Sequence, residues 1–466
     1  MISIPLNPNS PIPMYLQIYN YIKEEILSGR LSAPDKLPSA RSLASFLSVS
    51  RSTVDTAYQQ LVAEGYIEAK EKRGFYVNSI THTSSFHFSD EETPSPSIVS
   101  STKEYLYDFN PDGIDLEHFP YSVWKSIGKN QLDNPVNFIS APPFGLYELR
   151  QSIASYLLGA RGVHCQPEQI IVGAGLDHLL QMLCVFFQQK PVIAMEEPGY
   201  KSARNVLETN GYAIESIPLT DGSIALDQLY QSPASICYVT PSHQFPLGTV
   251  MPVYKRQQLL DWASLKKDRY IIEDDHDSEF RYVGKPIPAL QSIDCHEKVI
   301  YIGTFSKAIS PAIRTGYMVL PPHLCHAYEE ICGGYACPVS RISQGILNDF
   351  LRLGYFEKHL NRMRKNYRVR HDTMIHELKK NFPASLFSFS GDHAGLYILL
   401  HYHGSTKEDV LLERAEKNGI KLRTLKEYYA KLPADYHPVF LLGFASMPEE
   451  TIAKGISMLA KKIFLC

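Results

Sequence analysis

The sequence contains no run of 18 apolar residues, so it predicts no membrane-spanning helix. Its first residues, MISIPLNPNSPIP, lack a basic region followed by an apolar run, which argues against a secretory signal. The net charge is only −3, so a broad basic field is missing and any contact with nucleic acid must be local. Together these absences predict a cytoplasmic protein.

The eight cysteines include no CxxC pair. This pattern suits reduced thiols better than a disulfide framework or a zinc site, and we expect no bound metal. The chain has 466 residues, which is too long for one small core and suggests two or three domains.

Residues 1–78 show the pattern of three short helices followed by a hairpin. Apolar spacing and helix-ending glycines predict helices at Met14–Leu27, Ala40–Leu47 and about Ser52–Glu64. Ser39 is the expected N-cap of the second helix, and Ser52 with Asp55 fits a capping box for the third. Two short strands, 66–69 and 74–77, follow around a charged turn.

This arrangement predicts a winged helix-turn-helix whose third helix enters the major groove of DNA by its N-terminal end. Charge alone supports DNA binding weakly, because residues 1–80 hold eight Lys or Arg against seven Asp or Glu. A small helical module that binds another protein is the alternative.

The stretch LPSARSLASFLSVSRSTVDTAYQQLVAEGYIEAKEKRGFYV resembles the GntR-type DNA-binding domain. The resemblance implies DNA contacts from the second helix, the start of the third helix and the wing tip. The residues at those places are Arg41, Ser50, Arg51, Ser52, Thr53, Arg73 and Gly74. Asp55 departs from relatives that carry a base-reading arginine there, so no operator sequence can be transferred.

Residues 79–105 are rich in Ser, Thr and Pro without a sustained apolar period, which predicts a flexible linker. From residue 106 onward helices alternate with short apolar strands, which predicts an α/β sheet. Four of these strands end in residues suited to binding. They end, in chain order, at the glycine turn before Leu176, at Tyr200, at the acidic stretch from Asp274 and at Lys307.

Ligands gather at the carboxyl ends of strands in open α/β folds, so these four strand ends predict one site. Lys307 lies near Thr304, Ser306 and Arg314, which suits an imine to a phosphorylated aldehyde. The glycine turn exposes backbone N–H groups that suit a phosphate, although tight packing explains the turn equally well.

The acidic stretch DDHD (274–277) also offers ligands for a divalent metal. Neighbouring side chains along a strand point to opposite faces, so we expect one or two of the four to converge. With a lysine on the next strand, an acid that pairs with a pyridinium nitrogen explains the pattern better.

Residues 107–466 resemble the fold-type I aminotransferases, which use pyridoxal 5′-phosphate (PLP). The resemblance implies a mainly parallel sheet, a smaller C-terminal α/β subdomain from about residue 345, and a homodimer. Lys307 would form the aldimine, Asp274 would hold the ring nitrogen and Tyr200 would stack on the ring. The expected phosphate ligands are Gly175, Leu176, Thr304 and Arg314.

Three positions depart from the enzymes of that family. His276 stands where a tyrosine bonds the cofactor's phenolic oxygen, and Gln244 replaces the asparagine of the NPTG segment. Ser140 falls where a partner subunit lends a tyrosine to the phosphate. Arg423 is the expected anchor for the carboxylate of an effector, because its fork of donors fits that group.

The GntR-like head and the aminotransferase-like body together resemble the MocR/GabR family of bacterial transcription regulators, over essentially the whole chain. The segments TPSHQFPLG and GTFSKAISPAIRTGYMVLP carry this resemblance. It implies a regulator that binds double-stranded operator DNA and responds to PLP or an amino compound. An active aminotransferase that carries a DNA-binding head is the alternative.

Overall fold

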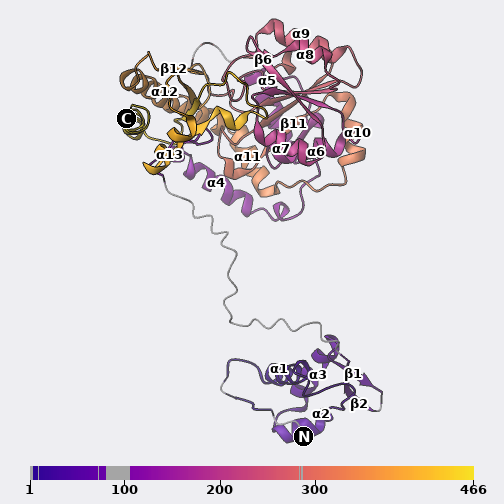
Figure 1. Ribbon diagram of the computed structural model, residues 1–466. Helices are drawn as coiled ribbons and strands as arrows, with labels where there is room; N and C mark the ends of the chain where they lie inside the picture. The colour runs from indigo at the N-terminus through magenta and orange to yellow at the C-terminus, as the bar shows by residue number, and fades with distance from the viewer. Residues whose placement is uncertain are drawn as a thin grey trace. The chain divides into compact units, whose positions relative to one another are not determined.

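The computed structural model describes residues 4–8, 10–71, 73–79, 105–282, 284 and 287–465. The chain separates into two compact units, residues 1–102 and 103–466, drawn in Figure 1. The predicted linker, 79–105, falls almost wholly outside the described residues.

The N-terminal unit contains three helices and a two-stranded wing (Figure 1). Helices α1 (Met14–Leu27) and α2 (Ala40–Leu47) have the predicted bounds, and Ser39 accepts a hydrogen bond from the Ser42 backbone as the predicted N-cap. Strands β1 (Ile67–Lys70) and β2 (Gly74–Val77) pair antiparallel. The helices bury a common core of Ile18, Ile22, Val54, Tyr58 and Leu61.

The predicted start of the third helix is wrong by one residue, and its predicted cap is wrong. Helix α3 spans Arg51–Ala63, and Ser50 is the N-cap because its hydroxyl accepts from the Thr53 backbone N–H at 3.2 Å. Ser50 has the extended backbone of a cap residue, whereas Ser52 already lies in the helix. The Asp55 carboxylate is therefore not part of a capping box, and it pairs with Arg51 instead.

The C-terminal unit is built on an eight-stranded sheet of order β4-β11-β10-β9-β8-β5-β6-β7. All neighbours pair in parallel except those involving β11 and β7, as the α/β pattern predicts. The strands are β4 (Ile170–Gly173), β5 (Ile193–Glu197), β6 (Ile214–Thr220), β7 (Ser223–Ile224), β8 (Ile236–Val239), β9 (Tyr270–Asp275), β10 (Val299–Thr304) and β11 (Gly316–Val319).

Helices cover both faces of this sheet, because consecutive residues of its central strands are buried and mostly apolar, so both faces must be shielded from water. On one face α6 (Leu176–Phe186), α7 (Lys201–Thr209) and α10 (Pro322–Cys332) pack on residues such as Ile272 and Ile300. On the other face α5 (Tyr147–Arg161), α8 (Leu226–Gln231) and α9 (Val253–Ser264) pack on neighbours such as Ile271 and Val299.

A smaller four-stranded sheet follows, with the order β12-β13-β16-β15. Its strands are β12 (Phe387–Ser390), β13 (Tyr397–Tyr402), β16 (Val439–Gly443) and β15 (Arg423–Thr424). The remaining helices are α4 (Tyr121–Leu132), α11 (Arg341–Arg352), α12 (Tyr355–Asn381), α13 (Glu408–Lys417) and α14 (Glu449–Met458). None of the helices in the described ranges is both long enough and apolar enough to cross a bilayer.

A short parallel pair joins the start of this unit to its end. Strand β3 (Tyr107–Asp108) pairs with β14 (Ile420–Lys421), and the Phe109 N–H donates to the Lys421 carbonyl at 3.1 Å. The chain that follows the predicted linker is therefore fixed to the smaller subdomain before it reaches the large sheet.

Candidate cofactor site

A cavity of about 220 Å³ lies at the carboxyl edge of the large sheet. Parallel strands end at the same edge, so β5, β8, β9 and β10 deliver their last residues there. Strand β11 runs antiparallel, so the residues that precede it also reach this edge. The lining residues named in the argument below are Asp112, Leu176, Tyr200, Thr240, Asp274, His276, Asp277, Thr304, Ser306, Lys307, Arg314 and Tyr397.

Lys307 follows β10 and is mostly buried, with 18% of its side chain exposed. Its Nζ donates to the Asp112 carboxylate and to the Pro111 carbonyl, each at 2.9 Å. It is the one lysine among the described residues that line the cavity. The cavity thus contains a single amine, held by an acid that the sequence did not single out.

Asp274 is buried at the end of β9. The Tyr238 hydroxyl donates to its carboxylate, but no cation in the described part of the chain forms an ion pair with it. Burial raises the pKa of Asp274 to about 7, and the charges of Asp275 and Asp277 act in the same direction. A buried carboxyl of this kind is suited to a cationic ligand group.

Asp275 points to the other side of the sheet, as alternation along a strand predicts. Its carboxylate accepts from Arg161 Nε at 2.6 Å and from the Tyr301 hydroxyl at 2.5 Å. The two adjacent aspartates therefore have different surroundings, and Asp274 is the one that lines the cavity.

Three of the four residues 274–277 line the cavity, so the expectation of one or two is wrong. The strand ends at Asp275, and beyond it the alternation no longer holds. Asp277 lies 2.9 Å from His243 Nδ1 and 3.3 Å from His276 Nε2. Burial alone would raise the pKa of Asp277, but the two imidazoles and Lys307 lower it to about 2. Candidate ligand atoms of His243, His276 and Asp277 lie within 4.8 Å of one another.

The buried acid at Asp274 predicts an unusual pH dependence of stability without cofactor. Its folded pKa of about 7 exceeds the ordinary 3.8, so between pH 4 and 7 the unfolded chain releases a proton that the folded chain keeps. The free energy of unfolding therefore falls as the pH rises, by roughly 2–3 kcal/mol from this group between pH 5 and pH 8. Denaturant unfolding at pH 5 and pH 8, followed by Trp124 and Trp262 fluorescence, measures this change.

An Asp274→Asn variant is the control, because the amide does not titrate. Its unfolding free energy should fall less over the same pH interval, with the residual slope assigned to Glu196, Glu273 and Glu279, whose pKa values burial also raises to about 7. Equal slopes in the two proteins would show that Asp274 does not hold a proton in the folded state.

The turn before α6 can hold an anion. Gly175 has φ +88°, and a Cβ there would lie 3.1 Å from Arg314 Nη2, so the position is restricted to glycine. Arg314 Nη2 donates to the Ala174 carbonyl at 3.0 Å, which places the guanidinium beside the helix N-terminus. Backbone N–H groups at the start of α6, with Thr304 and Arg314, are suited to a phosphate.

These features fit PLP. Lys307 would offer an amine to its aldehyde, and Asp274 would offer a carboxylate to its ring nitrogen. The turn at Gly175 and Leu176 with Arg314 supplies donors for its phosphate. Tyr200 presents an aromatic ring that also meets Phe245 edge to face at 5.3 Å.

Three other predicted positions lie outside this cavity. Arg423 on β15 donates from Nη1 to Glu427 at 2.8 Å, so an effector carboxylate would have to compete with that glutamate. Gln244 is buried and donates to the Pro198 carbonyl at 3.0 Å. Ser140 is exposed.

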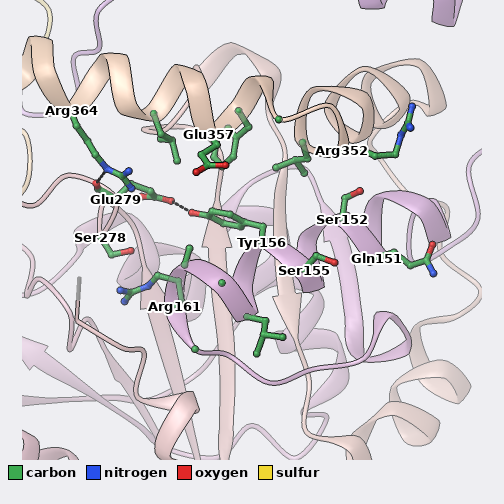
Figure 2. A pocket seen from close by; sticks show the side chains of 18 of the residues that line it. Gln151, Ser152, Ser155, Tyr156, Arg161, Ser278, Glu279, Arg352, Glu357 and Arg364 are labelled. Carbon is green, nitrogen blue, oxygen red and sulfur yellow. Dashed lines mark hydrogen bonds between the residues drawn. The ribbon is translucent and has the colours of Figure 1, made fainter. Parts of the chain in front are cut away.

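A larger groove of about 1420 Å³ lies between α5, α11, α12 and the segment that contributes Ser278, Glu279, Arg281, Gly284 and Pro288 (Figure 2). The Tyr156 hydroxyl donates to Glu279 at 2.8 Å, and Arg364 Nε donates to the Glu279 carbonyl at the same distance. No lysine occurs among the described residues that line it, and it lacks the phosphate-binding turn. Its size therefore does not make it the better cofactor site.

In the N-terminal unit the predicted DNA contacts lie at the surface. Arg41, Ser50, Arg51, Ser52 and Arg73 are exposed, whereas Thr53 and Gly74 are half-buried. The Ser50 hydroxyl lies 2.8 Å from the Ser52 hydroxyl and 2.7 Å from the Thr53 hydroxyl. The Ser50 hydroxyl thus bonds to both of the others at the start of α3, beside the exposed Arg51.

Sequence reasoning missed several residues that line the cavity. Thr240 follows β8 and could have been found by the same strand-end rule. Asp112 and Tyr397 come from segments far away in the chain, and no spacing links them to Lys307. Asp277 was seen only as part of an acidic stretch.

Comparison with known proteins agrees with both units. Residues 14–77 match the gntR family of bacterial regulatory proteins, and residues 112–459 match aminotransferase class I and II. The chain is 41% identical to the HTH-type transcriptional regulator YdeL of Bacillus subtilis, over 97% of each chain.

Two further relatives carry more specific names. The identity is 31% to the probable rhizopine catabolism regulatory protein MocR of Rhizobium meliloti, over 97% of this chain and 94% of the relative. It is 32% to the HTH-type pyridoxine biosynthesis transcriptional regulator PdxR of Corynebacterium glutamicum, over 96% of both. Among solved structures, the kynurenine aminotransferase of Pyrococcus horikoshii matches with a TM-score of 0.69 and 25% identity, over 78% of this chain and 91% of that one.

Proposed function

Because this chain belongs to the MocR family of HTH-type transcriptional regulators, we propose that it binds operator DNA and senses PLP or an amino compound through Lys307. The observation that carries this proposal is the single cavity that holds the amine of Lys307 and the buried carboxyl of Asp274. The DNA-binding residues belong to the N-terminal unit, and we place the protein with its DNA in the cytoplasm.

PLP, when bound, supplies an aldehyde that bonds reversibly to amines and a ring that withdraws electrons. Lys307 would hold the cofactor covalently through its Nζ, and the Asp112 carboxylate, 2.9 Å from that nitrogen, would orient it. Asp274 would keep a proton on the ring nitrogen, and Tyr200 would stack on the ring. The turn at Gly175 and Leu176 with Thr304 and Arg314 would hold the phosphate.

Two features favour sensing over rapid turnover. His276 lines the cavity in the place of the tyrosine that the enzymes use, and burial lowers its pKa, which favours a neutral imidazole. The proposed carboxylate anchor, Arg423, is already paired with Glu427. A ligand shifts a regulator only by binding its two states with different affinity, and displacement of the Lys307–Asp112 pair gives such a difference.

The test is a DNA-binding titration with the full-length protein. Duplexes selected from a random pool by the PLP-loaded protein serve as probes, and their affinity is measured without PLP, with PLP, and with PLP plus a panel of amines and amino acids. A change of at least threefold with PLP or with one amine supports the proposal. Equal affinity under all conditions would contradict sensing.

An active aminotransferase is the second candidate, because Lys307 and Asp274 share the cavity as such chemistry requires. A steady-state assay with amino donors and a keto-acid acceptor separates the two functions. Many turnovers at rates of about 1 s⁻¹ or more would favour the enzyme.

We also propose a homodimer. Large apolar side chains are exposed in the stretch just before Ser140: Leu132, Val136, Phe138 and Ile139. Apolar side chains gathered in one exposed stretch are typical of a contact surface. A second copy that covers this stretch would bring its Ser140 region toward a partner's site, where the related enzymes place a phosphate ligand.

Phe138→Glu should therefore weaken the dimer by at least 100-fold. The Phe138 side chain is 67% exposed in the single chain, and the substitution would place a charged carboxylate at this position in the buried interface. Light scattering after size exclusion measures the mass. Leu265→Glu is the matched control, since Leu265 is 66% exposed at the end of α9 and should leave the dimer intact. A monomeric wild-type protein at micromolar concentration would overturn this part of the proposal.

A further inference from the structure

Arg51 and Asp55 form an ion pair on the exposed face of α3. Arg51 Nε lies 3.3 Å from Asp55 Oδ2, and 71% and 38% of the two side chains are exposed. The spacing of four residues places both on the same face of the helix. Among the described residues Asp55 has no other ion pair or hydrogen bond, so its second carboxylate oxygen can accept one from a ligand.

This pair leaves the two terminal nitrogens of the Arg51 guanidinium available. Guanine presents O6 and N7 side by side in the major groove, and a guanidinium contacts both at once with two parallel hydrogen bonds. A free arginine side chain samples many rotamers. The contact between Arg51 Nε and Asp55 restricts them, so less conformational entropy is lost when the two terminal nitrogens bind a guanine.

The neighbouring side chains do not compete for this role. The hydroxyls of Ser52 and Thr53 each bond to the Ser50 hydroxyl, and Ser50 also caps the helix. Arg51 is therefore the one side chain in the first turn of α3 that can reach deep into the groove.

Stability alone does not explain Asp55. An exposed ion pair at this spacing stabilises a helix by only a few tenths of a kcal/mol. A carboxylate near DNA is also repelled by the phosphates. Such a side chain is useful where it accepts a hydrogen bond from a base, and the amino group of cytosine is the matching donor in the major groove.

We propose that Asp55 is a positioning and specificity-determining residue, which fixes Arg51 for a guanine and accepts a hydrogen bond from an adjacent cytosine. The inference rests on the proposed binding of operator DNA, but it does not depend on PLP sensing. We therefore expect a guanine next to a cytosine in each half of the preferred site.

The experiment selects duplexes from a random pool with full-length wild-type protein, Asp55→Ala, Asp55→Glu and Arg51→Ala. The wild type should enrich a motif with a guanine next to a cytosine. Asp55→Ala should bind that motif about tenfold more weakly, lose preference at those two positions, and bind unrelated duplexes more tightly because a negative charge is gone. Asp55→Glu should restore part of the guanine preference.

Two comparisons separate this role from a structural one. In an Arg51→Ala background, Asp55→Ala should no longer change the guanine preference, because the two residues act as a unit. A helix weakened by the substitution would reduce the affinity for all duplexes equally and leave the motif unchanged, which would overturn the proposal. A wild type that enriches no motif would overturn operator binding itself.

Discussion

Lys307→Ala will abolish the near-visible absorbance of the attached cofactor and the response of DNA binding to PLP or amines. The cavity has one lysine among its described lining residues, so no other amine there can replace it. Covalent attachment of PLP should be lost completely. The affinity for the selected duplex without ligand should change less than threefold. Absorbance spectra and the DNA-binding titration measure the two outcomes.

Lys201→Ala is the matched control, because Lys201 is an exposed lysine at the start of α7. It should bind cofactor and respond like the wild type. A Lys307→Ala protein that still responds normally would exclude sensing through this amine. Loss of DNA binding without any ligand would instead point to a folding defect, which circular dichroism would detect.

Asp274→Asn will weaken PLP binding by at least 100-fold. A carboxylate in this buried position forms a charged hydrogen bond with a protonated ring nitrogen, and a neutral amide cannot replace the charge. Equilibrium dialysis with reduction of the bound cofactor measures the affinity. Asp227→Asn, an exposed acid on α8, should leave the affinity unchanged.

The same substitution should stabilise the protein without cofactor. At pH 8 the buried Asp274 carboxylate is charged and lacks an ion-pair partner among the described residues, so its removal should raise the unfolding free energy by about 1–3 kcal/mol. A variant that is more stable but binds PLP poorly would indicate a residue kept for its ligand. A variant weakened in both respects would mean that the Tyr238–Asp274 contact is needed for packing.

Much of the fold and of the cavity followed from local patterns. The alternation of helices and strands predicted an α/β sheet, and the resemblance to the fold-type I aminotransferases implied its mainly parallel order. The rule of alternating side chains predicted that the adjacent acids diverge, and the resemblance selected Asp274 from the pair. The end of α1 and the cap at Ser39 also followed from short-range signals, because a helix end depends on a few neighbouring groups.

Other features depend on tertiary contacts that no spacing encodes. Asp112 meets Lys307 across 195 positions in the chain, and Tyr397 reaches the cavity from the smaller subdomain. The cap of α3 was misjudged because Ser50 and Ser52 are both good cap residues, and only the backbone angles decide between them. Arg423 was chosen by its chemistry, but its pairing with Glu427 depends on the turn that follows β15.

The short pairing of β3 with β14 links the chain segment that carries Asp112, a residue of the cavity, to the smaller subdomain. Asp112 lies four residues beyond β3, and Arg423 lies two residues beyond β14, so both side chains extend from one short pair of strands. A ligand that pulls Asp112 away from Lys307 or Arg423 away from Glu427 strains the same few backbone hydrogen bonds. Those bonds hold the first described residues after the predicted linker, so displacement of Asp112 would act on the segment that fixes the start of this unit to its smaller subdomain.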